Sequence, residues 1–366
     1  MLNSRPTLSR MVPYVPGKSI AQVLPLVEVE LPILKLASNE TPLGCPIQLS
    51  ELAPYFETIH HYPGELPAAL RERLARHWGI SDAHFVLGNG SDEVIGFVAM
   101  AYLNPGEQVI SSACTFSEYR FATYLLNGDY REIPLCSDWH HDLDGILGAI
   151  TPQTRLIYLA NPNNPTGLTI PVAELDSFLA RVPASVMVIL DEAYGEFVPQ
   201  GELLNPVALI QKHSNVVVLR TFSKLYGMAG FRVGYAIAAP EVCHELRKVA
   251  APFNVNSLAL AAARLALDKT DFVSESLRLN ALGRAYFYAQ LDEMGLDYLK
   301  SGANFVCIFT DIEASILTAA LIKQGIIVRG LTSFGIHDGI RVTIGLPDQN
   351  ERFFKTFKLI LKRISG

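Results

Sequence analysis

The sequence predicts an α/β fold with a large domain, in which helices sandwich a mostly parallel sheet, and a smaller α/β domain built from the N-terminal arm and the C-terminal segment. Short, continuous apolar runs rich in β-branched residues occur at 155–160, 186–190 and 216–219, separated by helical lengths of chain. Such runs are typical of parallel strands that are buried on both faces. The pattern changes after about residue 266, so we expect an arm at 1–45, a large domain at 46–266 and a small domain at 267–366.

The individual elements follow one another in an order that fits this division. The segment 67–79 has Leu70, Leu74 and Trp78 at helical spacing and predicts a helix. The segment 257–269 is rich in Ala and Leu and predicts a helix that bridges the two domains. The small domain is predicted to contain strands at 303–310, 325–330 and 339–345, and helices at 313–324 and 350–364.

The composition argues against several classes of function. With 30 basic and 36 acidic side chains and a net charge of -6, the chain has no basic stripe for nucleic acid. The cysteines are scattered without a C-x-x-C pair, and the paired histidines are adjacent in sequence, so we expect no metal site. The N-terminus lacks the apolar core of a signal peptide, and no run of about 18 apolar residues predicts a membrane span. We therefore expect a cytoplasmic protein.

Polar residues collect where predicted strands end, which is where ligands bind in α/β sheets. In FVLGNGSDEV at 85–94, two glycines precede Ser91 and Asp92 at the start of an apolar helix. The free N–H groups and positive dipole end of a helix form an anion site, for which phosphate is the natural occupant. The alternative interpretation is structural, with Ser91 capping the helix and Asp92 favouring its dipole.

Two further strand ends carry an amide and a carboxylate. The stretch ANPNNPTG at 160–167 follows a buried strand and holds the amide of Asn164 in a rigid, proline-rich loop. Asp191 ends another apolar strand, and Tyr194 follows three residues later. Removing a carboxylate from water is costly unless a cation or a strong donor meets it. Asp191 therefore either faces a buried cationic ligand or caps the next turn.

The fourth strand end carries a lysine. Lys224 follows the run VVVL, with Thr221 and Ser223 before it and Arg232 eight residues after it. Hydroxyls and an arginine suit a phosphate, and a lysine held out of water can attack a carbonyl. An aldehyde for Lys224, a phosphate for the hydroxyls and Arg232, and a basic ring nitrogen for Asp191 together describe pyridoxal phosphate. The sequence thus predicts this cofactor, joined to Lys224 as a Schiff base.

The same stretches resemble the fold-type I pyridoxal-phosphate-dependent aminotransferases of class II. The matching segments follow the family's order and cover nearly the whole chain. They are VPYVPGK, KLASNETPLG, HYPGELPAALR, LGNGSDEV, ANPNNPTG, LDEAYGEF, RTFSKLYGMAGFRVGYA, PFNVNSLALAAA, ANFV, GIIVRG and IRVTIG. The resemblance implies an enzyme, an aminotransferase whose cofactor is pyridoxal 5'-phosphate.

The resemblance also implies a role for each matched residue. Lys224 is the expected Schiff-base lysine and proton shuttle, Asp191 the partner of the ring nitrogen, and Tyr194 and Asn164 the contacts to the ring's phenolate oxygen. The expected phosphate-binding residues are Ser91, Asp92, Thr221, Ser223 and Arg232. Phe116 is expected to stack on the ring. Tyr62 resembles a residue that reaches the phosphate of the neighbouring subunit's cofactor, which implies a homodimer with shared active sites.

The implied reaction is a transamination in histidine biosynthesis. L-histidinol phosphate gives its amino group and leaves as imidazole acetol phosphate, and 2-oxoglutarate takes the group and leaves as L-glutamate. Arg341, helped by Arg329 and Tyr14, is expected to bind the anionic end of both substrates. Aminotransferases of aromatic amino acids and threonine-phosphate decarboxylases share the cofactor residues, so these activities stay open as alternatives.

Two interpretations from other classes of protein lack a second supporting feature. The stretch TFSK at 221–224 has the Ser/Thr-x-x-Lys spacing of an acyl-transfer site, but the nearest match to its partner motifs is DKTD at 268–271, which fails. A ligand-binding regulator on this fold usually carries an added DNA-binding domain. The 45 residues before the α/β region leave little room for one.

Overall fold

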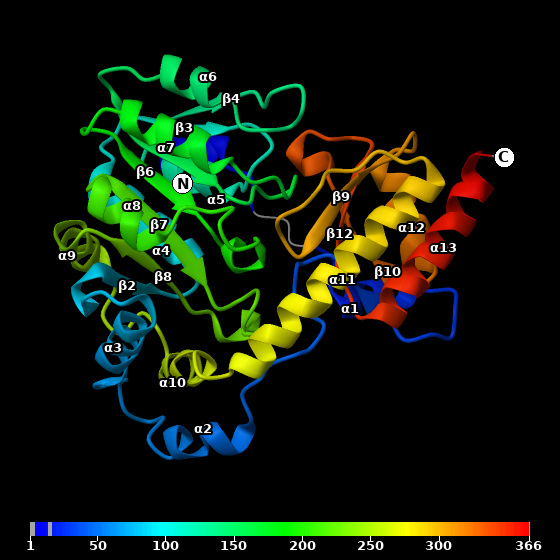
Figure 1. Cartoon of the computed structure of the whole chain (residues 1–366), viewed down its shortest axis with the longest axis horizontal. Helices are drawn as coiled ribbons and strands as arrows, with labels where there is room; N and C mark the ends of the chain where they lie inside the picture. The colour runs from blue at the N-terminus through cyan, green and yellow to red at the C-terminus, as the bar shows by residue number, and fades with distance from the viewer. Residues whose placement is uncertain (1–3, 14–16, 366) are drawn as a thin grey trace.

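The computed structural model describes residues 4–13 and 17–365, which form two lobes (Figure 1). The larger lobe is built on a seven-stranded sheet with the order β2-β8-β7-β6-β5-β3-β4. Its strands are β2 (Phe85–Gly88), β3 (Gln108–Ser112), β4 (Asp129–Ile133), β5 (Thr154–Ala160), β6 (Met187–Asp191), β7 (Val216–Thr221) and β8 (Gly234–Ala238). The pairings are parallel except those of β8 with β2 and β7. The predicted α/β class with a mostly parallel sheet is therefore confirmed.

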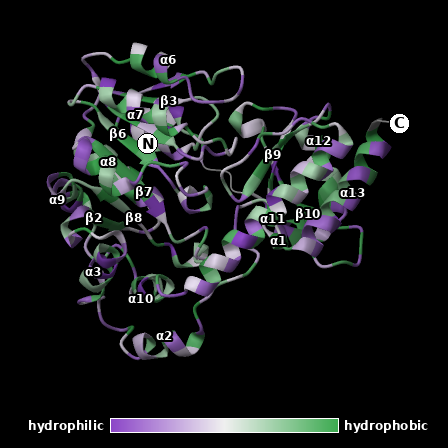
Figure 2. Ribbon diagram, in the orientation of Figure 1, coloured by the Kyte–Doolittle hydropathy of each residue, from purple (hydrophilic) through white to green (hydrophobic). Residues whose placement is uncertain are grey.

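Helices cover both faces of this sheet, whose strands are predominantly hydrophobic (Figure 2). Helices α4, α5 and α9 bury their apolar side chains against one face, and α3, α6, α7, α8 and α10 against the other. The helices of this lobe are α2 (Leu49–Phe56), α3 (Leu66–Trp78), α4 (Ser91–Tyr102), α5 (Glu118–Leu125), α6 (Leu143–Gly148), α7 (Val172–Arg181), α8 (Pro206–Lys212), α9 (Pro240–Val249) and α10 (Ser257–Ala266). Burial on both faces explains why the central strands read as continuous apolar runs rather than alternating ones.

The ends of the central strands are polar but still covered. Every residue of β6 and β7 is buried, including Asp191 and Thr221 at their carboxyl ends. Because β6 and β7 are parallel neighbours, these two polar residues lie at the same edge of the sheet. The predicted strand ends thus converge on one region.

The smaller lobe combines the C-terminal part of the chain with the N-terminal arm. Its sheets have the orders β11-β12-β9 and β1-β10, and the second one joins the arm to the C-terminal part. The strands are β1 (Leu34–Lys35), β9 (Phe305–Phe309), β10 (Ile326–Ile327), β11 (Arg329–Gly330) and β12 (Gly339–Thr343). The helices are α1 (Ile20–Val23), α11 (Thr270–Met294), α12 (Ala314–Lys323) and α13 (Pro347–Ser365). Short 3-10 helices occur at Pro6–Arg10, Leu24–Leu26, Asp82–His84, Gly195–Phe197, Ala229–Phe231 and Thr332–Phe334.

The prediction that the 257–269 helix bridges the lobes is wrong. Helix α10 packs against α3 and α2 inside the larger lobe, and its residues from Ala259 to Ala263 are buried. The chain then turns at Asp268 and Lys269, and α11 runs from the larger lobe to the smaller one (Figure 1). A helix buried on nearly all sides belongs to a core, so the alanine-rich composition indicated packing rather than bridging. The domain limits at 45/46 and 266/267 stay predictions.

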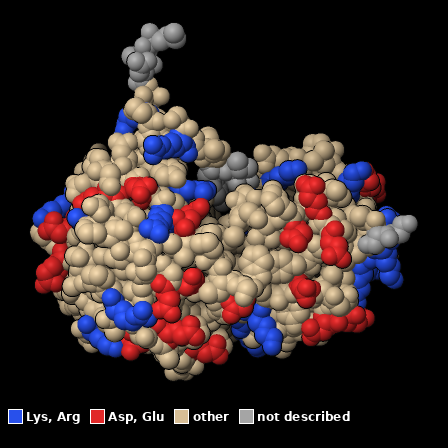
Figure 3. Space-filling model, turned by 90° about the horizontal axis from the view of Figure 1, so that it is seen from above, with Lys and Arg blue, Asp and Glu red and all other residues tan. Residues whose placement is uncertain are grey.

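Charged side chains of both signs are interspersed on the face that Figure 3 shows. No helix in the described part of the chain is long and apolar enough to cross a membrane.

Candidate active site

A cavity of about 900 Å³ is lined by residues of both lobes. It brings together nearly all of the residues that the sequence predicted for a site. The predicted residues in its lining are Ser91, Asp92, Phe116, Asn164, Asp191, Tyr194, Thr221, Ser223, Lys224, Arg232, Arg329 and Arg341. Tyr62 is not in this lining in the described structure, and Tyr14 lies outside the described residues.

One end of the cavity presents donors suited to a dianion. Helix α4 begins at Ser91, so its unpaired N–H groups and its positive dipole end face this region. The Thr221 hydroxyl donates to Ser223 Oγ at 3.0 Å, and Arg232 Nη1 donates to the same oxygen at 3.2 Å. Arg232 Nη2 also donates to Asp92 Oδ2 at 3.1 Å. Asp92 therefore orients the guanidinium rather than opposing an anion directly.

Position 90 requires glycine, because the backbone there is left-handed and passes close to the Arg232 side chain. Gly90 has φ +82°, and a Cβ atom there would overlap the Arg232 guanidinium. Across the same contact, a Cβ on Gly234 would come within 2.5 Å of the Ser91 backbone nitrogen. The two glycines thus allow the strand end, the helix start and the arginine to approach one another closely.

Asp191 is buried and accepts hydrogen bonds from neutral donors. Tyr119 Oη donates to Asp191 Oδ2 at 2.8 Å, and the Ala193 N–H donates to Oδ1 at 3.1 Å. Burial raises the pKa of this carboxyl to about 6, because the two donors offset only part of the loss of hydration. A protonated ring nitrogen beside Asp191 would supply the positive charge that a buried carboxylate requires.

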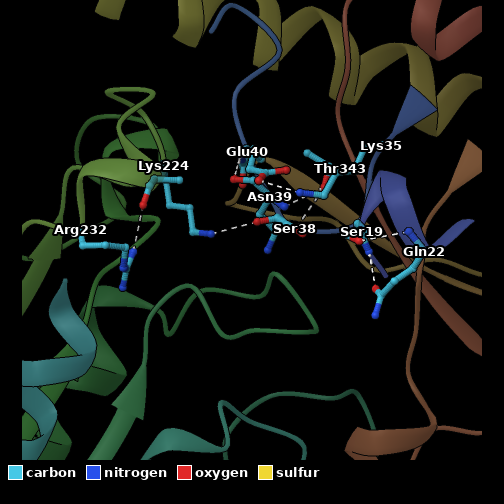
Figure 4. Close-up of polar contacts among 12 residues, drawn as sticks. Ser19, Gln22, Lys35, Ser38, Asn39, Glu40, Lys224, Arg232 and Thr343 are labelled. Carbon is cyan, nitrogen blue, oxygen red and sulfur yellow. Dashed lines mark hydrogen bonds and ion pairs between the residues drawn. The ribbon is translucent and has the colours of Figure 1, made fainter. Parts of the chain in front are cut away.

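Lys224 extends from the larger lobe toward the N-terminal arm (Figure 4). Its Nζ donates to the Ser38 backbone oxygen at 3.0 Å and lies 5.7 Å from the centre of the Tyr194 ring. Tyr194 Oη accepts a hydrogen bond from Asn39 Nδ2 at 2.8 Å. The lysine and the tyrosine thus lie on one side of the cavity, and the arm contacts both.

The smaller lobe contributes two arginines that are cross-strand partners. Arg329 of β11 pairs with Arg341 of β12, so both side chains leave the same face of the sheet. Arg341 is buried, and its Nη2 donates to the Ala37 oxygen at 2.8 Å. Its Nη1 donates to Asn164 Oδ1. Asn164 follows β5, in the loop in which the Asn161–Pro162 and Asn164–Pro165 peptide bonds are both cis.

These residues lie within a stretch, 32–357, that matches the sequence model of the family described as "Aminotransferase class I and II". The chain belongs to the class I and II aminotransferases. It is similar to the histidinol-phosphate aminotransferase of Moorella thermoacetica, with 41% identity over 359 residues, 98% of this chain and 92% of that protein. It is equally similar to that of Symbiobacterium thermophilum, with 41% identity over 362 residues and 99% of each chain.

A solved structure supports the same family assignment for this aminotransferase. The structure of histidinol-phosphate aminotransferase from Sinorhizobium meliloti in complex with pyridoxal-5'-phosphate has a TM-score of 0.87 to this chain. The two sequences are 26% identical, and the match covers 98% of this chain and 99% of that one. The predicted fold and family are therefore confirmed.

Pyridoxal phosphate is the cofactor of this aminotransferase, and the chemistry of the cavity fits it. The start of α4, two hydroxyls and Arg232 match the phosphate group. Asp191 matches the protonated ring nitrogen, and Lys224 provides an amine for the aldehyde. Phe116, which meets the Tyr119 ring edge-on at 5.8 Å, provides an aromatic face in the same lining.

Several residues that the sequence did not predict contact the predicted ones, among them Tyr119, Asn39 and Ser38. Tyr119 donates to Asp191, Asn39 donates to Tyr194, and the Ser38 oxygen accepts from Lys224. A signal existed for Tyr119, because a buried tyrosine hydroxyl needs a polar partner and this one follows Phe116 by three residues. Ser38 and Asn39 lie in KLASNETPLG, one of the segments that resemble the family, but the segment does not indicate their contacts, whose partners lie far away in the sequence.

We expect the Tyr119→Phe aminotransferase to lose activity roughly tenfold, because it removes one of the hydrogen bonds that stabilise ionised Asp191. Steady-state kcat, measured with saturating cofactor, tests this expectation. Tyr158→Phe is the matched control, since Tyr158 stacks on Tyr119 at 4.8 Å but donates to the Ile95 oxygen. An equal loss in both variants would assign the effect to packing and contradict a specific role for the Tyr119 hydroxyl.

Proposed function

We propose that this aminotransferase transfers the amino group of L-histidinol phosphate to 2-oxoglutarate, in histidine biosynthesis. The observation that carries the proposal is a second cationic site in the cavity, formed by Arg341 and Arg329 on the smaller lobe. The first site, at Ser91 and Arg232, matches the cofactor phosphate, so the second remains for the anionic group of a substrate. A paired guanidinium site accepts both a phosphate and a carboxylate, as this reaction requires.

The names of the relatives support the same substrate. The two curated relatives above carry the name histidinol-phosphate aminotransferase and match this chain over nearly its whole length. An aromatic amino acid brings a carboxylate that the arginine pair also accepts, so the choice of histidinol phosphate over an aromatic amino acid depends on the names of the relatives. The arginines alone do not distinguish a transamination from decarboxylation of threonine phosphate, and for that distinction the proposal depends on the relatives.

Each proposed residue has a task that its surroundings suit. Bound pyridoxal phosphate supplies an electrophilic carbon and a ring that accepts electrons from the substrate. Lys224 would hold the cofactor through its amine, and the same amine would move the substrate proton. Asp191 would favour the protonated form of the ring nitrogen, and Tyr194 and Asn164 would hold the ring oxygen. Phe116 would hold the face of the ring.

The phosphate group of the cofactor is proposed to lie among Ser91, Thr221, Ser223 and Arg232, with Asp92 orienting the arginine. The substrate anion is proposed to bind Arg341 and Arg329, with Tyr14 as a further contact. Arg341 is the stronger candidate, because the Ala37 oxygen and Asn164 hold its guanidinium in a fixed place. Binding to a preorganised arginine costs less conformational entropy than binding to a mobile one.

We expect Arg341→Lys to raise KM for histidinol phosphate by roughly 10- to 100-fold, the value of a charge-assisted hydrogen bond, because lysine cannot present two parallel donors. The matched control is Arg352→Lys, another arginine of the smaller lobe that donates to the backbone oxygen of Gln324. The assay compares kcat/KM for histidinol phosphate, tyrosine and threonine phosphate in the presence of 2-oxoglutarate. Preference for tyrosine, or release of carbon dioxide from threonine phosphate, would contradict the proposed substrate.

We also propose a homodimer in which Tyr62 reaches the cofactor phosphate of the partner subunit. The Tyr62 side chain is 76% exposed and stacks on the exposed Phe253 ring at 4.3 Å, which places an aromatic pair on the surface. Exposed pairs of this kind are common at protein interfaces. Sedimentation velocity of the cofactor-loaded protein tests the dimer, and a single chain per particle would contradict it. The cytoplasmic location stays a prediction.

A further inference from the structure

A second, much smaller cavity lies where the N-terminal arm meets α11 and the start of β9. Its volume is about 20 Å³, which is enough for one water molecule. Three polar side chains in its lining, Ser276, Asn280 and Asn304, are buried, with exposed fractions of 6%, 6% and 4%. Ser276 Oγ, Asn280 Oδ1 and Asn304 Oδ1 have no hydrogen-bond partner within the described part of the chain.

The orientation of the two amides follows from their other contacts. Asn280 Nδ2 donates to the Ala303 oxygen at 3.3 Å, and Asn304 Nδ2 donates to the Asn39 oxygen at 3.0 Å. A carbonyl oxygen only accepts, so each amide must turn its NH₂ group toward that carbonyl. The Oδ1 atoms are therefore the acceptors left for the cavity. Leaving two buried acceptors and a hydroxyl unpaired would be strongly destabilising.

One water molecule would satisfy all three groups at once. It would donate one hydrogen bond to each Oδ1 atom and accept one from the Ser276 hydroxyl, which gives it the three partners typical of a buried water. A metal cation fits less well, because hard cations take about six or more oxygen ligands. Among the described residues that line the cavity, none is acidic.

This small cavity is connected to the active site through Asn304 and Asn39. Asn304 Nδ2 donates to the Asn39 backbone oxygen. The Thr343 hydroxyl accepts from the Asn39 backbone nitrogen at 3.0 Å and donates to its Oδ1 atom at 3.2 Å (Figure 4). Asn39 has φ +55°, a left-handed conformation that these contacts hold in place. Its Nδ2 then donates to Tyr194 Oη at 2.8 Å. Because Tyr194 accepts from Asn39, its own proton is left to be donated to another group.

We propose that Ser276, Asn280 and Asn304 bind one buried water molecule, which fixes Asn304 and, through it, the Asn39 amide that directs the Tyr194 hydroxyl toward the cofactor. The water site does not depend on the proposed function, whereas its consequence for Tyr194 rests on it. Asn304 is a positioning residue, because it acts through Asn39. Asn39 lines the large cavity and is proposed to act through its hydrogen bond to Tyr194.

A crystal structure of the cofactor-loaded enzyme, at a resolution that shows ordered water, tests the site directly and needs no variant. The expected result is one density peak within hydrogen-bonding distance of Ser276 Oγ, Asn280 Oδ1 and Asn304 Oδ1. Empty density would overturn the proposal, and so would a peak with the short distances and additional ligands of a cation. Loss of this peak in Ser276→Val, whose side chain fills the cavity, is the expected counterpart.

The consequence for Tyr194 is tested by the pH titration of the visible band of the lysine-bound cofactor. Asn304→Asp has nearly the same shape but cannot donate to the Asn39 oxygen. We expect this substitution to raise the pH midpoint of the visible band by about one unit, the equivalent of one hydrogen bond. Without the Asn304 donor, the Asn39 amide no longer donates firmly to Tyr194 Oη, so the Tyr194 oxygen holds its proton more tightly and donates more weakly to the ring oxygen of the cofactor. The less stabilised ring oxygen in turn leaves the proton of the lysine-bound cofactor more tightly held. Asn280→Asp is the matched control, since Asn280 lines the same cavity but contacts Ala303 instead of Asn39. Its midpoint is expected to stay unchanged.

The Ser276→Val variant tests the effect of the water while leaving the Asn304 amide in place. If the water fixes Asn304, its displacement shifts the midpoint in the same direction as Asn304→Asp. A lower unfolding temperature with an unchanged midpoint would mean that the water is only structural, and would overturn the proposed connection to Tyr194. If the cofactor-loaded enzyme shows no visible band, the proposed bond between Lys224 and the cofactor is wrong. The crystallographic peak would still decide the water site.

Discussion

Replacing Lys224 with alanine is expected to lower kcat by more than about 10⁴-fold, because the variant would lose the amine that is proposed both to bond the cofactor and to move the substrate proton. Lys224 Nζ lies in the cavity beside the Tyr194 ring, with the Ser38 oxygen as its hydrogen-bond acceptor. Lys224→Arg retains the positive charge but cannot form a Schiff base, so it should be nearly as inactive. The measurement is steady-state transamination with added pyridoxal phosphate.

Lys35 provides the control for this prediction. It lines the same cavity, but its Nζ is paired with Glu40 Oε1 at 2.8 Å (Figure 4). Lys35→Ala should therefore change kcat by less than about tenfold, the scale of one lost hydrogen bond or ion pair. If Lys224→Ala retained activity, or if both variants were equally impaired, the assignment of the catalytic amine to Lys224 would be wrong.

Replacing Asp191 with asparagine is expected to lower kcat by at least about 10³-fold, because an amide cannot keep the ring nitrogen of the cofactor protonated. Asparagine fits the site, since its oxygen can accept from the Ala193 N–H and its NH₂ group can donate to Tyr119 Oη. The loss would therefore report on charge rather than on misfolding. Activity close to that of the unchanged enzyme would contradict the role of Asp191.

The same substitution should stabilise the cofactor-free protein. Burial raises the pKa of Asp191 to about 6, well above the ordinary value of about 3.9. Between these values the folded state holds a proton that the unfolded state releases, so the free energy of unfolding falls as the pH rises. Asp191→Asn removes this dependence. Its stability advantage over the unchanged protein should therefore grow by more than about 1 kcal/mol between pH 5 and pH 8.

Urea unfolding of both cofactor-free proteins at the two pH values measures this difference. Asp176→Asn is a suitable control, because Asp176 is exposed and paired with Lys212 on the surface. An advantage of Asp191→Asn that stays constant with pH would show that burial does not raise the pKa of Asp191. Together, the kinetic and unfolding results would identify Asp191 as a residue that serves the cofactor at the expense of the stability of the cofactor-free protein.

The sequence predicted the parts of the site that follow strand ends. Asp191 and Thr221 come together because parallel neighbours end at one edge of a sheet, and this rule needs only the order of apolar runs. Arg329 and Arg341 lie on the other lobe, and their inclusion depended on the resemblance to a family. The alanine-rich 257–269 helix was assigned the wrong position, because buried and bridging helices are not distinguished by composition alone.

The remaining contacts depend on how segments far apart in the chain come together, which the spacing within one segment does not encode. Asn39 lies 155 residues from Tyr194 and 304 from Thr343, yet it bonds to both. Ser276, Asn280 and Asn304 read in the sequence as ordinary polar residues. Their shared cavity becomes visible only when the arm, α11 and the start of β9 are placed together.

The central claim is that a Lys224-bound pyridoxal phosphate accepts the amino group of histidinol phosphate. Its most direct test is the visible absorption spectrum of the purified, cofactor-loaded protein before and after the addition of histidinol phosphate without any keto acid. We expect a yellow band that bleaches as the amino group is transferred to the cofactor, and that returns when 2-oxoglutarate is added. A yellow band that ignores histidinol phosphate would contradict the proposed donor, and the absence of any band after addition of pyridoxal phosphate would contradict the cofactor site itself.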